Sequence, residues 1–161
     1  VFYNEEDQSN GIAFQGVGSG GTYDYIQVHN NGDDGIEFFG GTANVKHAVI
    51  TGAQDDSFDW TDGWQGNVQY LIIEQSDGSD YAFEGDNRSD SAPDTTPRST
   101  PAISNFTILG LDTNGARFRE GMGGDFVNGV FVDTAFGVRI DDACDALGVP
   151  NGTFEAVSYT H

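Results

Sequence analysis

The sequence predicts an all-β fold, a right-handed single-stranded parallel β-helix (solenoid) of about six coils, from three observations. An apolar patch recurs every 22 to 24 residues, with one longer step of 35. A second apolar patch lies within each period, and turn-forming residues fill the gaps between patches. No helical periodicity interrupts this order. The repeating patches start at Ile12, Ile36, Phe58, Tyr81, Ala116 and Val138.

The first strand of each coil is a triplet of an apolar residue, a spacer and a large apolar residue. Alternate residues of a strand face opposite sides, so the outer two positions are predicted to point inward. That places Phe14, Phe38, Trp60, Phe83, Phe118 and Ile140 in one column behind the starting residues. The spacers form an outward column of Ala13, Glu37, Asp59, Ala82, Arg117 and Arg139, followed by Gln15, Phe39, Thr61, Glu84, Arg119 and Asp141.

The second strand of each coil follows a similar alternation. Its patches are Ile26–Val28, Ala48–Ile50, Leu71–Ile73, Phe106–Ile108 and, more loosely, Asn128–Val130. Each patch ends 8 residues before the next triplet. The gaps carry Gly, Asn and Asp, as in Asn31–Gly35, which suit tight turns.

One step breaks the period, and the two ends carry no cap. The longer step predicts an insertion loop near residues 86–101, where three of the four prolines lie. Val1–Gln8 has no helical cap signature, and Phe154–Tyr159 has the pattern of another strand. Because solenoids need capped ends, the chain is predicted to be one β-helix domain over residues 1–161, a segment of a longer protein or one completed by neighbouring subunits.

Composition excludes some function classes. The chain has 26 acidic and 6 basic residues, for a net charge of −20. Phosphates would be repelled, which argues against nucleic acid as a partner. No apolar run approaches the roughly 20 residues of a membrane-spanning helix. The single cysteine, Cys144, cannot form an internal disulfide; it either pairs outside this segment or is a small buried residue.

Acidic residues recur in the turns, and stacking of the coils should bring them together. Ca²⁺ takes six to eight oxygen ligands, which a ladder of carboxylates and carbonyls can supply. The alternative is that Asp33, Asp34, Asp55 and Asp56 merely bond backbone amides of the turns. The candidate Ca²⁺ ligands are Asp33, Asp34, Asp55, Asp56, Asp77 and Asp80.

Three segments, Asn10–Gly20, Asp33–Thr42 and Asp55–Gly63, resemble a family of secreted bacterial β-helix proteins of unassigned function. Thr96–Ser99 and Ile103–Thr107 are also similar to it. The resemblance covers nearly the whole chain. It implies the pectate-lyase-like superfold and export from the cytoplasm, and it supplies no catalytic residue set.

Charge is sorted along the outward face, with acids in the middle coils and arginines after them. Polysaccharide lyases on the superfold implied by the resemblance hold Ca²⁺ with carboxylates and act on substrate with an arginine or lysine. The residues that would serve a catalytic role are Asp59, Glu84, Arg117 and Arg119. The alternative is that stacked opposite charges only neutralise one another.

Two aromatic side chains are candidates for glycan contact. Trp64 lies in a turn, off the core pattern, and Phe39 lies in an outward column. For Trp64 the alternative is packing over its own turn.

The expected function is a non-catalytic extracellular or cell-surface scaffold that binds Ca²⁺. Its partners would be copies of itself, stacked through uncapped ends, or extracellular glycans. The alternative is a polysaccharide lyase or hydrolase, or a carbohydrate-binding module, acting on the outer strand face.

Overall fold

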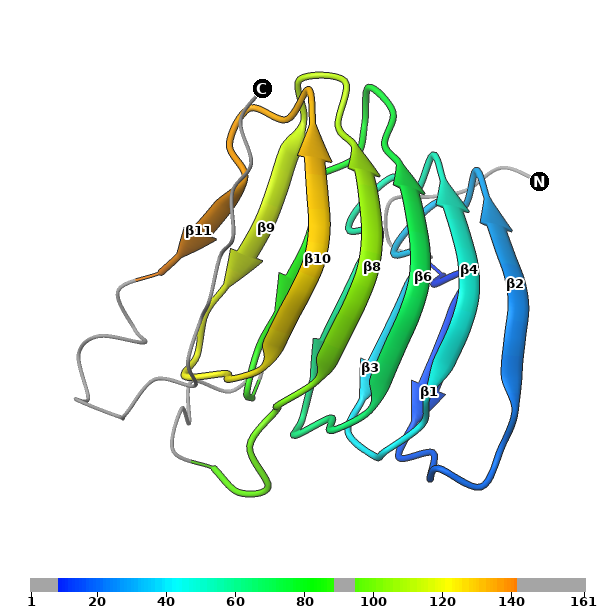
Figure 1. The fold of residues 1–161 in the computed structure, drawn as a ribbon, viewed down its shortest axis with the longest axis vertical. Coiled ribbons are helices and arrows are strands. Elements are labelled where there is room, and N and C mark those ends of the chain that lie inside the picture. Colours follow the sequence, from blue (N-terminus) through cyan, green and yellow to red (C-terminus); the bar gives the residue numbers. More distant parts are fainter. Residues whose placement is uncertain (1–8, 89–94, 142–161) are drawn as a thin grey trace.

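The computed structural model describes residues 9–88 and 95–141, which form a parallel β-solenoid (Figure 1). In this part of the chain there are eleven strands and no helix. The strands alternate between two parallel sheets, so each coil adds one strand to each sheet. The predicted fold class is confirmed, with five complete turns and a last strand that begins a sixth.

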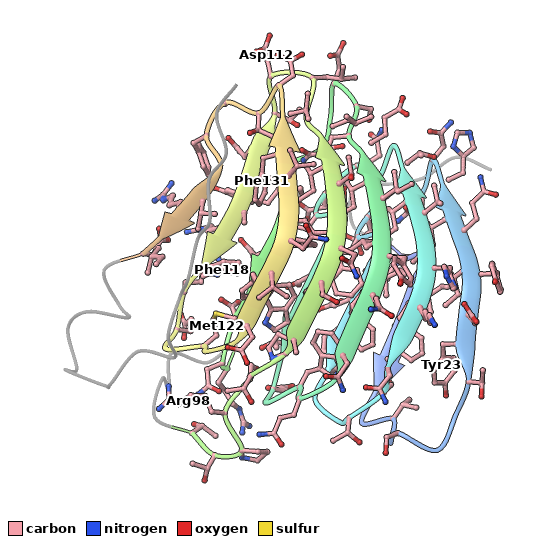
Figure 2. All side chains as sticks on the ribbon, viewed as in Figure 1. Tyr23, Arg98, Asp112, Phe118, Met122 and Phe131 are labelled. Carbon is pink, nitrogen blue, oxygen red and sulfur yellow. The ribbon has the colours of Figure 1, made fainter. Side chains whose placement is uncertain are left out.

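The odd-numbered strands form a six-stranded sheet in sequence order. Their bounds are β1 Ile12–Gln15, β3 Ile36–Phe39, β5 Phe58–Thr61, β7 Tyr81–Gly85, β9 Asn114–Phe118 and β11 Val138–Ile140. The even-numbered strands form a five-stranded sheet: β2 Tyr23–His29, β4 Val45–Thr51, β6 Asn67–Glu74, β8 Ala102–Leu109 and β10 Asp125–Val132. Phe118 of β9 and Phe131 of β10, both labelled in Figure 2, belong to these two sheets and pack in or against the core.

Apolar side chains fill the space between the sheets, as the alternation predicts. Aromatic rings stack from coil to coil, and the rings of Phe14 and Phe38 lie 4.6 Å apart and nearly parallel. The last strand keeps the predicted face, because Val138 and Ile140 pair with the inward Ala116 and Phe118. They are nevertheless 37% and 52% exposed, because the described residues place a neighbouring strand on only one side of β11.

The register between β5 and β7 differs from the sequence alignment by two residues. Phe58 pairs with Phe83 rather than Tyr81, and Trp60 pairs with Gly85 rather than Phe83. Space explains the shift, because a Cβ at Gly85 would fall far inside van der Waals contact of the Trp60 indole. A strand slip of two residues keeps every side chain on its own face.

This shift changes the outward column. Asp59 is in register with Glu84, and Glu84 with Arg117. Ala82, predicted to occupy that outward position, is fully buried instead. The acids and arginines therefore lie closer along one column than the sequence alignment indicates.

Each strand of the five-stranded sheet carries one non-glycine residue with positive φ, between 53° and 62°. These residues kink their strands at the same level: Tyr25, His47, Tyr70, Asn105 and Asn128. The rings of Tyr25 and His47 stack at 4.6 Å, and those of His47 and Tyr70 at 4.9 Å. The kinks therefore build an outer ladder of side chains along the solenoid.

The looser second-strand patch is corrected by one residue. Gly129 and Phe131 pair with the inward Phe106 and Ile108, whereas Val130 is 46% exposed. The predicted triad Asn128–Val130 therefore begins one residue too early. The last gap to Val138 is accordingly one residue shorter than the other gaps.

The predicted insertion follows β7. Its described end is anchored to the coil: Ser99 donates its amide to Asn87 Oδ1 at 2.8 Å and accepts the Gly63 amide on Oγ at 3.0 Å. Residues 89–94, Cys144, Val1–Gln8 and Phe154–Tyr159 lie outside the described residues. Within those described, no helix is long and apolar enough to cross a membrane.

Candidate cation-binding face

The turns before β3 and β5 each place an aspartate two residues before the strand. Asp34 precedes β3 and accepts the Asp56 amide on Oδ1 at 3.0 Å. Asp56 precedes β5 and accepts the Tyr81 amide at 2.8 Å. Bonding to turn amides is thus confirmed for these two residues, although across coils rather than within one turn. These bonds fix the carboxylates and leave each a second oxygen.

The strands that follow carry carboxylates on their outward face. Glu37, Asp59 and Glu84 are successive Cα partners in β3, β5 and β7. In β3 and β5 the turn aspartate lies three residues before the strand acid, and the oxygens of the two groups lie close together. Four groups of three acids have ligand oxygens within 4.8 Å of one another: Asp33/Asp34/Asp55, Asp34/Glu37/Asp59, Asp55/Asp56/Asp80 and Asp56/Asp59/Glu84.

These groups are two arrangements, each repeated one coil along. We name Asp34/Glu37/Asp59 the first face triad and Asp56/Asp59/Glu84 the second face triad. Asp59 belongs to both. The other two groups lie in the turns and share Asp55 in the same way. The solenoid therefore repeats not only the fold but also the carboxylate geometry.

Burial dominates the electrostatics of the face. Burial, together with the charges of neighbouring carboxylates, raises the pKa of Asp34 to about 8 and that of Asp56 to about 9. Burial also raises the pKa of Glu37 and of Glu84. For Asp59 burial, followed by the charges of the surrounding acids, holds the pKa well above its usual value. Without a cation, this face favours protonated carboxyl groups.

Asp59 is the least satisfied member. Its Oδ1 is buried and has no hydrogen-bond partner among the described residues. Its carboxyl group shares a hydrogen bond with that of Glu37, which requires a proton on one of them. Glu37 also accepts a bond from the Asn10 side-chain amide. A buried acceptor without a donor is costly, and a bound cation would satisfy it.

Two arginines flank the face at the next coil, in β9 and directly after it. Arg119 donates from Nε and Nη2 to the two oxygens of Asp86, at 2.6 and 2.8 Å. Arg117 donates from Nε and Nη2 to Asp141 at 2.9 and 2.7 Å. Burial alone would lower the pKa of both guanidinium groups, but these hydrogen bonds and the neighbouring carboxylates raise it. Neither arginine can readily give up a proton.

The structure brings most of the residues proposed from sequence together, but not all of them. Among the predicted metal ligands, Asp77 belongs to none of the four groups, and the others do. Asp59 and Glu84, predicted for catalysis, lie within the same cluster as the predicted metal ligands. Sequence reasoning assigned Glu37 no ligand role. Asp34-x-x-Glu37 and Asp56-x-x-Asp59, repeated one coil apart, are the signal that could have joined turn and strand acids.

The two aromatic residues proposed for glycan contact, Trp64 and Phe39, differ in their burial. Trp64 is fully buried, with its ring stacked 4.0 Å from Phe38 and its Nε1 donating to Ala43 O at 3.1 Å. It cannot contact a glycan in this structure, because the turn around it folds inward and fills the core. Phe39 lies in register with Gln15 and Thr61 and is partly buried.

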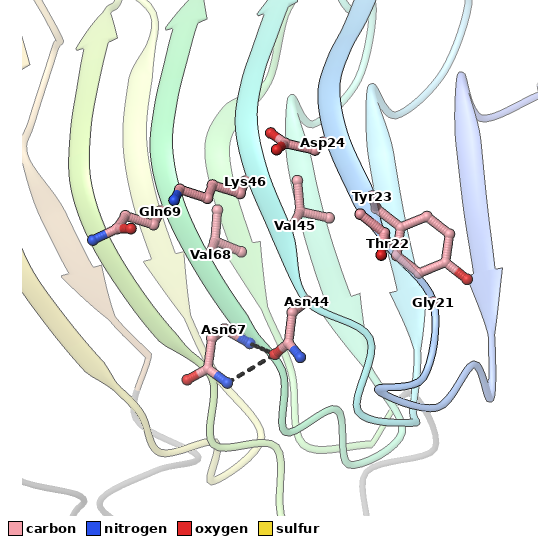
Figure 3. A pocket seen from close by; sticks show the side chains of 10 residues that line it. All are labelled: Gly21, Thr22, Tyr23, Asp24, Asn44, Val45, Lys46, Asn67, Val68 and Gln69. Atoms are coloured by element: carbon pink, nitrogen blue, oxygen red, sulfur yellow. Dashed lines mark hydrogen bonds between the residues drawn. The ribbon is translucent and has the colours of Figure 1, made fainter.

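A shallow groove of about 300 Å³ lies on the five-stranded sheet instead (Figure 3). Its lining includes Asn44, whose Oδ1 accepts two bonds from Asn67 at 2.8 Å. Lys46, also in the lining, places its ammonium 5.6 Å from the centre of the Tyr70 ring. This groove is on a different sheet from the carboxylates.

The repeating coil and its parallel pairing agree with the comparison with known families. The model of the pectate-lyase-like β-helix domain matches residues 1–161. The chain belongs to this family. No curated protein and no solved structure matches it significantly. Membership in the pectate-lyase-like β-helix family establishes the scaffold.

Proposed function

We propose that this chain is a Ca²⁺-binding, non-catalytic β-solenoid module, with the ion held on the outer face of the six-stranded sheet. The observation that carries the proposal is Asp59, whose buried Oδ1 lacks a partner although Asp34 and Glu37 lie beside it. Within the described part of the chain, none of these three residues forms an ion pair. A divalent cation would supply the missing positive charge.

The ligand chemistry favours calcium. The face triads offer only carboxylate oxygens, with no histidine or cysteine, which disfavours zinc. Mg²⁺ demands near-ideal octahedral geometry, whereas Ca²⁺ accepts six to eight oxygens in irregular arrangements. Three carboxylates leave room for water or carbonyl ligands in such a shell.

A structural role agrees with the state of the arginines. A lyase needs a base that can lose a proton, and both Arg117 and Arg119 are held in ion pairs that raise their pKa. We further propose an extracellular location. Modules there bind Ca²⁺ with dissociation constants of about 10⁻⁴–10⁻³ M, as free calcium in that compartment allows.

A second candidate function, cleavage of an acidic polysaccharide, is favoured by one observation. Asp59 and Glu84 lie side by side with raised pKa values, and a carboxyl group with a raised pKa can serve as a general acid. Turnover of a panel of uronate polymers, lost in Asp59→Asn, would support this candidate. No turnover with intact Ca²⁺ binding would support the structural role.

The decisive experiment is calorimetric titration of chelator-treated protein with CaCl₂ at pH 8. We expect a dissociation constant of about 10⁻⁴–10⁻³ M, weakened at least about tenfold in Asp59→Asn, which removes the shared ligand charge. Asp77→Asn is the matched control, because it removes the same charge outside all four groups. Equal loss in both variants, or no binding by the natural sequence, would contradict the proposal.

A further inference from the structure

We infer that Arg117 and Arg119 set the number of cations on this face, by holding Glu84 so that only the first face triad binds Ca²⁺. This inference rests on the proposed function and concerns its regulation. The two triads are nearly identical in composition and placement. Asp34, Glu37 and Asp59 are replaced one coil along by Asp56, Asp59 and Glu84.

The turn positions of the two triads are equivalent. Asp34 and Asp56 each use one oxygen to accept the amide of the next coil, at 3.0 and 2.8 Å. Both are largely buried, with 8% and 5% exposure. Nothing in the turns therefore distinguishes the two sites, and the repeat by itself would provide two.

The strand positions differ in their partners. Glu37 accepts a neutral amide from Asn10 and shares a hydrogen bond with Asp59. Glu84 uses both oxygens for guanidinium groups: Oε1 accepts from Arg117 Nη1 at 3.2 Å, and Oε2 from Arg119 Nη2 at 2.5 Å. In the second face triad, the positive charges of Arg117 and Arg119 already neutralise Glu84.

These guanidinium groups are anchored on their far sides. Arg119 is bidentate to Asp86, which is 6% exposed, and Arg117 makes two bonds to Asp141. Charge-assisted bidentate pairs of this kind are among the strongest hydrogen bonds in proteins. A Ca²⁺ ion at the second triad would have to detach Glu84 from two fixed positive charges that also repel the ion.

Native mass spectrometry with Ca²⁺ tests the stoichiometry directly. The natural sequence should bind one ion on this face, and the double variant Arg117→Gln/Arg119→Gln should bind a second one. Arg139→Gln is the matched control: Arg139 bonds Asp141 at 2.6 Å, so its removal lowers the positive charge nearby while Glu84 stays paired. That control should keep one ion.

A second measurement covers the case in which the double variant does not fold. In the otherwise natural sequence, Glu84→Gln should retain the single ion, whereas Glu37→Gln should lose it. Loss of the ion in both would overturn the inference. So would one ion with unchanged affinity in a folded double variant, or two ions in the natural sequence. Absence of any ion in the natural sequence would overturn the proposed function as well, which separates the two failures.

Discussion

Raising the pH from 5 to 7 in the presence of a chelator should destabilise this protein. Burial raises the pKa of Asp34 to about 8 and of Asp56 to about 9, against 3.8 in an exposed chain. Between these values the folded state binds more protons than the unfolded state. Stability then falls as the pH rises, and it is fully present only below the unfolded pKa.

The size of the effect follows from the number of protons retained. If the cluster as a whole keeps one proton more than the unfolded chain, the slope is about 1.4 kcal/mol per pH unit, or about 3 kcal/mol between pH 5 and 7. Counting one retained proton for the cluster, rather than one for each of Asp34 and Asp56, keeps the calculated loss of stability at its lower end. Even so, the loss is a large part of the 5–15 kcal/mol typical of a domain.

Urea unfolding followed by tryptophan fluorescence measures this change, since Trp60 and Trp64 are fully buried. Adding Ca²⁺ at about 100 times its dissociation constant should restore about 2.7 kcal/mol at pH 7, and less at pH 5, where protons occupy the ligands. Asp56→Asn should flatten the slope in chelator, and Asp77→Asn should not. Stability that is constant or rises from pH 5 to 7 in chelator would refute the reasoning. Asp141 has a lowered pKa, so its opposite contribution is confined to more acidic pH.

Further predictions concern the core. Gly85→Ala should lower the free energy of unfolding by about 1–3 kcal/mol, because the added Cβ would overlap the Trp60 indole. Gly18→Ala is the control, because a Cβ there would have nothing within 4 Å. Equal urea midpoints for the two variants would contradict the register between β5 and β7. Trp64→Ala should lower it by about 3–5 kcal/mol, as for a core residue. Tyr25→Ala, at a 79% exposed ring, should change it by less than about 1.5 kcal/mol. Comparable losses in these two variants would show that Trp64 is not a core residue.

Much of the fold follows from local patterns. The triplets beginning at Ile12, Ile36 and Phe58 predict β1, β3 and β5 at their starting residues and in correct register. The alternation is sufficient here because the period varies little and each inward residue meets another apolar residue one coil away. The insertion after β7 is likewise visible as an excess of residues and prolines.

The same reasoning fails where volume decides. Two alignments of β7 satisfy the alternation, with either Tyr81 or Phe83 beside Phe58. Only one leaves room for the Trp60 indole, by placing Gly85 next to it. Trp64 shows the same limit, because a turn residue outside the periodic pattern fills the core between Phe38 and Phe58. Neither packing choice is visible in the order of polar and apolar residues.

The candidate site shows this division most clearly. The sequence by itself determined the coil, the acidic composition and the recurrence of aspartates in the turns, because these depend on residue type and spacing. The tertiary structure decided that turn and strand carboxylates form one buried face, that Asp59 is shared between two triads and that arginines hold Glu84. Those outcomes depend on the register between coils and on the direction of each side chain. The register that sets Asp59 beside Glu84 is fixed by close packing of Gly85 against Trp60, at distances that a linear pattern does not contain.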